Sequence, residues 1–152
     1  MDNANERDVV QPVLSALRVN WSGVAAGTLA AYVAGFLWYG VLFEDHWRVL
    51  TGAAPAESPP VMAMGFAVVL ISVFGLDWVI RRTGSLGWFS GARVGLATAF
   101  FFALTVAAND FIYGVKPLVL IPIDAGYILV WFGAAGCMVG GLQRRARPSP
   151  AA

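Results

Sequence analysis

The stretch WSGVAAGTLAAYVAGFLWYGVLF, residues 21–43, contains no charged side chain. A helix of this length, rising about 1.5 Å per residue, crosses the roughly 30 Å hydrocarbon core of a bilayer. Three further apolar runs follow at 60–80, 94–115 and 118–142, each with one aspartate as its single charged residue. The sequence therefore predicts an all-α integral membrane protein, a four-helix bundle whose transmembrane domain spans residues 21–142.

The composition agrees with a lipid environment. Hydrophobic residues make up 59% of the chain and charged residues 12%, and the mean hydropathy is +0.70. A soluble domain of 152 residues could not bury this much apolar surface within itself. The net charge of +1 provides no basic face for a phosphate backbone, so nucleic acid is not an expected partner.

The basic residues predict the orientation of the spans, because short cytoplasmic flanks are enriched in Lys and Arg. One side of the predicted bundle holds Arg7, Arg18, Arg81, Arg82, Arg93, Arg144, Arg145 and Arg147, and the other side holds Arg48 and Lys116. This bias places both termini in the cytoplasm and indicates a multi-pass protein of the bacterial inner membrane. Residues 1–20 are predicted to form a short helix on the inner interface, and residues 143–152 a basic tail.

Small residues at four-residue spacing predict where the helices pack, because they allow two backbones to approach closely in lipid. The predicted helix-packing residues are Gly23, Gly27, Ala31 and Gly35 in the first span, Gly136 and Gly140 in the fourth, and Gly91 with Gly95 at the entry to the third. We interpret them as contacts within one bundle in preference to a dedicated dimerisation face.

The acidic residues inside the spans are expected to have partners or functions, because a charge is costly in hydrocarbon. Asp77 precedes Arg81 by four residues, a spacing that predicts an ion pair on one helix face. Asp110 and Asp124 lie at similar depth near the outer ends of two successive spans. They are candidates for a proton, ion or ligand site, and we hypothesise that they line one outward-facing polar cavity with Asn109 and Tyr127.

Structural roles for the same carboxylates are also open at this point, and they are the preferred interpretation. If the fourth helix begins at Pro122, Asp124 would accept hydrogen bonds from exposed backbone N–H groups of the first turn. Lys116 could neutralise Asp110 by extending its side chain toward it. Tyr113 also lies at this level, and the candidate residues of the outer interface are Trp38, Tyr39, His46 and Trp47.

Catalysis has no support in the residue inventory. One histidine and one cysteine, Cys137, provide too few ligands for a metal or haem site, so no metal is expected. The sequence also lacks a nucleophile triad and a phosphate-binding glycine loop. We therefore expect no enzyme activity and no cofactor held by this chain alone; lipid can bind it, and any pigment or haem would be held by a partner.

Several short motifs resemble a known family. They are Asn20-Trp21, Trp38-Tyr39-Gly40 with Phe43 and Trp47, Gly52, Asn109, and Asp124 with Gly126-Tyr127. On these residues the chain is similar, from Asn20 to Leu142, to the bacterial domain of unknown function 1761 family of small four-span membrane proteins. The family pattern usually has glycine after the phenylalanine, where this chain has Glu44. The resemblance implies the four-span topology and supplies no reaction.

Two functions compete on this basis. The first is an accessory or structural subunit that packs against a larger membrane complex, such as a respiratory or photosynthetic one. The second is a small homo-oligomeric transporter or channel that uses Asp110 and Asp124. The expected partners are membrane lipid and either a membrane protein or further copies of this chain. An integral membrane enzyme acting on lipid or quinone is a third, less supported reading.

Overall fold

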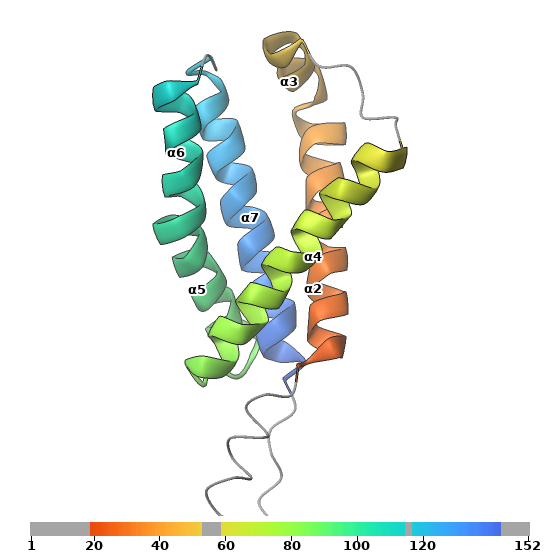
Figure 1. Ribbon diagram of the computed structural model, residues 1–152, viewed down its shortest axis with the longest axis vertical. Coiled ribbons are helices and arrows are strands. Elements are labelled where there is room, and N and C mark those ends of the chain that lie inside the picture. The colour runs from red at the N-terminus through yellow and green to blue at the C-terminus, as the bar shows by residue number, and fades with distance from the viewer. Residues whose placement is uncertain (1–18, 53–58, 115–116, 144–152) are drawn as a thin grey trace, which may run out of the picture.

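Four long helices form the fold of the computed structural model, which describes residues 19–52, 59–114 and 117–143 (Figure 1). In chain order the elements are α2 (Trp21–Leu37), the π-helical η1 (Trp38–Leu42), α3 (Glu44–Thr51), α4 (Pro59–Arg82), α5 (Trp88–Thr98), the π-helical η2 (Ala99–Ala103), α6 (Leu104–Tyr113) and α7 (Leu120–Gly141). No strand occurs in these ranges, so the predicted all-α class is confirmed.

The helices long and apolar enough to cross a membrane are Trp21–Leu42, Pro59–Arg82, Trp88–Tyr113 and Leu120–Gly141. The protein is therefore a multi-pass membrane protein. The start of α2 and the end of α7 lie together at what we call the terminal end of the bundle, and α3 lies at the opposite end, which we call the α3 end (Figure 1). The predicted interfacial helix and basic tail fall outside the described residues, except for 19–20 and 143.

The third helix differs from its predicted bounds. It begins at Trp88, six residues before the predicted start at Val94, and so includes Arg93. The apolar pattern stops at this arginine, but a backbone helix does not have to end at a charge. Arg93 is exposed near the terminal end of its helix, where an arginine can extend its guanidinium toward the headgroups.

The last helix, α7, lies in the middle of the bundle and packs on α2, α5 and α4. Figure 1 shows it between α2 on one side and α5 with α6 on the other. The buried hydrophobic core is drawn from all four long helices, and it comprises Val24, Ala31, Val73, Leu76, Ile80, Ala99, Trp131, Phe132, Ala135 and Val139. The core is thus built around α7.

The contact between α5 and α7 is made by backbone against backbone. Gly91 and Gly95 on α5 face Gly136 and Gly140 on α7, and the N–H of Gly87 donates to the carbonyl of Gly140 at 2.8 Å. A Cβ atom added to Gly91 would overlap the Gly136 carbonyl oxygen, and one added to Gly140 would lie 2.7 Å from the Gly91 Cα. Only glycine fits at this crossing.

The predicted small-residue row of α2 lies against the other side of α7. A Cβ at Gly27 would lie 3.1 Å from side-chain atoms of both Val139 and Val73, and Ala31 is fully buried. Gly23 meets the Val139 backbone, and Gly35 lies beneath the Tyr127 hydroxyl. The structure therefore uses these small residues for packing inside one bundle.

Replacing Gly91 by alanine is expected to destabilise the bundle, because the new methyl group would push α5 away from α7. We expect Gly91→Ala to lower the free energy of unfolding by about 2 kcal/mol. Gly75→Ala is the matched control, since an added Cβ there meets nothing within 4 Å; it should change stability by less than about 0.5 kcal/mol. Unfolding in detergent followed by circular dichroism measures both, and equal stability of the two variants would contradict the tight crossing.

Candidate functional site

A π turn at the end of α2 organises the α3 end of the bundle. Residues 38–42 are π-helical, and the N–H of Phe43 donates to the Trp38 carbonyl at 2.9 Å, five residues earlier. Such a turn contains one more residue than an α-helical turn and is frequent at functional sites. Here the two consecutive side chains of Trp38 and Tyr39 both reach α7.

Trp38 binds the backbone of α7. Its indole N–H donates to the carbonyl of Ile123 at 3.0 Å. The same ring covers Gly126, where an added Cβ would lie 2.8 Å from the indole Cζ2. The close approach explains why a glycine is suited to position 126.

Tyr39 binds the Asp124 carboxylate. Its hydroxyl donates to Asp124 Oδ1 at 2.8 Å, a hydrogen bond strengthened by the charge of its acceptor. The Tyr39 ring also packs on Tyr127 and Trp47, with ring centroids 4.8 Å and 5.5 Å apart. Tyr39, Trp47, Asp124 and Tyr127, all singled out in the sequence, therefore form one group, which with Trp38 we call the aromatic clamp.

The helix-capping interpretation of Asp124 is wrong. The fourth helix begins at Leu120 instead of Pro122, and its N-cap residue, Val119, provides no side-chain cap. Asp124 thus lies beyond the first turn of α7. The backbone N–H groups at this position donate to carbonyls within the helix, so they do not need a side-chain acceptor. Its carboxylate accepts from Tyr39 of η1, which continues α2, instead.

The other predicted polar residues at this end lie on exposed surfaces. Asp110 is exposed on α6, and the Asn109 amide turns back to donate to the Thr105 carbonyl at 3.0 Å. Tyr113 is 85% exposed, and His46 is exposed on α3. The structure therefore directs Asp124 toward α2, whereas Asn109 and Asp110 stay on the surface of α6. Lys116 lies outside the described residues.

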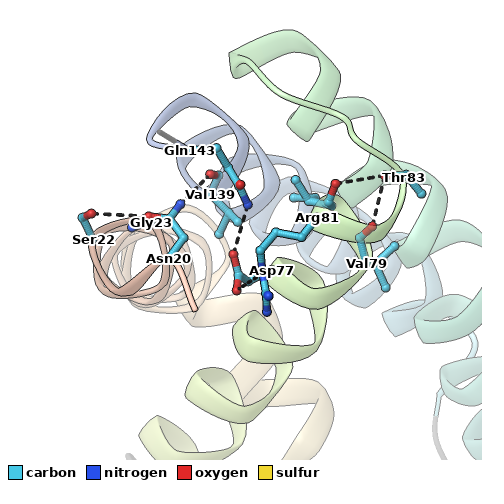
Figure 2. A network of polar contacts seen from close by, with 10 residues as sticks. Asn20, Ser22, Gly23, Asp77, Val79, Arg81, Thr83, Val139 and Gln143 are labelled. Atoms are coloured by element: carbon cyan, nitrogen blue, oxygen red, sulfur yellow. Dashed lines mark hydrogen bonds and ion pairs between the residues drawn. The ribbon is translucent and has the colours of Figure 1, made fainter. Parts of the chain in front are cut away.

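A second polar group ties the helices together at the terminal end (Figure 2). Asp77 is fully buried, and the Arg81 Nε lies 2.9 Å from its Oδ2, which confirms the predicted ion pair. The Gln143 amide donates to the other carboxylate oxygen at 3.2 Å. Asp77 thus joins α4 to the end of α7.

Asn20 completes this group by joining α2 to α7. Its side-chain oxygen accepts from the Gly23 N–H at 3.1 Å, which caps α2, and its amide donates to the Val139 carbonyl at 3.1 Å (Figure 2). These roles of Asn20 and Gln143 were not predicted from the sequence. The position of Asn20 directly before an apolar run is a recognisable N-cap signal, whereas its reach to α7 requires the tertiary structure.

The aromatic clamp and the polar group at the terminal end both join helices to one another. Each contains one carboxylate, held by a hydroxyl at the α3 end and by an arginine at the terminal end. Among the described residues, no group of three or more His, Cys, Asp and Glu side chains could hold a metal ion.

Tyr39→Phe is expected to weaken the joint between α2 and α7 by removing one interhelical hydrogen bond. The free energy of unfolding should fall by about 1 kcal/mol. A double-mutant cycle with Asp124→Ala should give a coupling energy of about the same size. Tyr113→Phe, on an exposed ring, is the control and should be neutral. A coupling energy of zero would show that the bond does not hold the helices together.

Arg81→Met should destabilise the protein more strongly, by about 3 kcal/mol, because it leaves the buried Asp77 carboxylate without its counter-charge. Adding Asp77→Asn should recover most of this loss, since it removes the remaining charge and keeps an acceptor for Gln143. Arg82→Met is the neighbouring control; Arg82 is exposed and lies over the Trp78 ring, so it should cost less than about 1 kcal/mol. Failure of the double variant to recover would contradict an electrostatic origin.

Comparison with known proteins assigns the chain to a family. No curated protein and no solved structure matches the chain. The profile of the family described as "Protein of unknown function (DUF1761)" matches residues 22–140. This range covers the four long helices apart from Trp21 and Gly141, and both polar groups apart from Asn20 and Gln143. The chain therefore belongs to the DUF1761 family of membrane proteins.

Proposed function

We propose that this protein is a non-catalytic accessory subunit that associates with a larger protein of the same membrane. The observation that carries this proposal is the exposure of the first half of α4. Its first ten residues, 59–68, are all exposed, although they belong to a helix that crosses the membrane. The second half of the same helix is packed, with Val73, Leu76 and Ile80 buried in the core.

The exposed half of α4 is held to α2 by a small contact. The Tyr32 hydroxyl donates to the Met62 carbonyl at 2.9 Å, and the Tyr32 and Phe66 rings meet edge to face at 5.6 Å. In lipid, apolar surface alone does not drive helices together, so a stable position requires close packing or hydrogen bonds. A second protein that packs on this half of α4 would supply that support.

One face of α4 is suited to such a partner. Met64, Val68, Ile71 and Gly75 follow one another at the spacing of a helix-packing stripe, and all four are exposed. Gly75 has open space around it, so the backbone of another helix can approach closely there. Methionine adapts its shape to a partner surface.

The proposal also includes the membrane, the orientation of the chain and the cofactors of the complex. We propose the bacterial inner membrane with both termini in the cytoplasm; Arg81 and Arg82 at the terminal end and Arg48 at the α3 end support this orientation. In a respiratory or photosynthetic assembly, haem or pigment would be held by the partner. Lipid would cover the remaining exposed apolar surface.

A small homo-oligomeric transporter or channel is the alternative proposal. It is favoured by the position of Asp110, an exposed carboxylate inside a long apolar helix, which in an oligomer could face a second copy. An apolar groove lies between α2 and α4, and it gives this alternative little support because neither Asp110 nor Asp124 lines it.

A photo-crosslinking amino acid at position 64 tests the association in native membranes. We expect a discrete adduct with a different membrane protein, whereas the same group at position 102 should give adducts with lipid only. The two positions are matched, because Met64 is 69% exposed and Phe102 is 70% exposed. An adduct with a second copy alone would favour the transporter, and equal labelling at 64 and 102 would contradict the proposed face.

A further inference from the structure

A groove lies between α2 and α4, beside the exposed half of α4. The groove has a volume of about 370 Å³, within the range of small-molecule sites. Its walls are almost entirely apolar, and it is lined by Ala25, Thr28, Leu29, Tyr32, Phe66 and Leu70. The hydroxyl of the lining residue Tyr32 donates to the Met62 carbonyl of α4 at 2.9 Å.

One polar atom in the groove lining is unusual. The other threonines of the described residues donate to the carbonyl four residues earlier; they are Thr51, Thr98 and Thr105 in helices and Thr83 directly after α4. Thr28 is only 3% exposed, yet its hydroxyl oxygen has no hydrogen-bond partner. Native proteins rarely leave a buried hydroxyl unpaired. A bound group could supply the missing partner.

The depth of Thr28 restricts what that partner can be. Thr28 follows the start of α2 by seven residues, or about 10 Å at 1.5 Å per residue, which places it within a hydrocarbon core of roughly 30 Å. Water does not occupy this region, and phospholipid ester groups stay at its boundary. The partner oxygen must therefore belong to a molecule that dissolves in the hydrocarbon.

We propose that the groove between α2 and α4 binds a lipid-soluble quinone, a ring with carbonyl oxygens on an isoprenoid tail. Threonine in a helix occupies two χ1 rotamers, so the Thr28 hydroxyl can turn to donate to a quinone carbonyl without movement of the backbone. Tyr32 and Phe66 supply aromatic surfaces for the ring, and Leu29 and Leu70 supply apolar surface for the tail. The proposal is independent of the partner protein proposed above and includes no redox step.

Photolabelling of the purified full-length chain in lipid nanodiscs tests this site. The probe is an azido-ubiquinone with two isoprene units, and mass spectrometry locates the label. We expect labelling near Tyr32, Phe66 or Leu70 that unlabelled ubiquinone with two isoprene units displaces. Squalane, an isoprenoid hydrocarbon without oxygen, should not displace it.

Two variants and one control separate the hydroxyl from the shape of the groove. Thr28→Val keeps the shape and should weaken quinone binding about five-fold, the worth of one neutral hydrogen bond. Thr98→Val removes a hydroxyl outside the groove and should leave binding unchanged. Ala25→Leu should narrow the groove and reduce labelling, while its helix content and melting temperature in detergent show that it folds.

Four results would overturn the proposal. Displacement by squalane as effectively as by the quinone, or unchanged binding by Thr28→Val, would assign the groove to lipid tails. Label outside the groove would remove the site. Labelling of the purified chain but not of the chain in native membranes would mean that another helix covers the groove.

Discussion

Backbone contact between α5 and α7 is the constraint on which the rest of this bundle depends. In water, burial of apolar side chains would hold four such helices together, but lipid tails solvate leucine as well as another helix does. The attraction must therefore come from atoms brought very close. Gly91, Gly95, Gly136 and Gly140 achieve this by having no side chains. With α5 fixed on one side of α7, the opposite side of α7 remains for α2.

Polar contacts at the two ends fix how the helices are aligned along this packing. At the α3 end, Trp38 and Tyr39 hold the beginning of α7. At the terminal end, Asn20 binds its last turn and Asp77 binds Gln143, two residues beyond that turn. Each bond has a fixed donor and acceptor, so a helix that slid by one turn would lose them all. The glycine contacts allow the helix backbones to approach closely, and the polar contacts select one alignment of the helices along their axes.

The sequence predicted those features that depend on one helix at a time. Long apolar runs indicated four spans, small-residue spacing indicated packing faces, and the Asp77 to Arg81 spacing indicated their ion pair. The bond between Tyr39 and Asp124 depends on how two helices are placed, and no spacing along the chain contains that information. The π turn that directs Tyr39 has no local sequence signature either. For the same reason the splay of α4, and the groove beside it, could not be foreseen.

The central position of α7 also affects how the protein is made. Ribosomes deliver the helices to the membrane in chain order, and α7 is the last of the four to emerge. Until it arrives, α2 and α5 lack the surface on which both of them pack, and their glycine faces remain in contact with lipid. The first three helices must therefore persist in the membrane as a loose set. Assembly of the bundle therefore becomes a post-insertion event, completed when the last of the four helices enters the membrane.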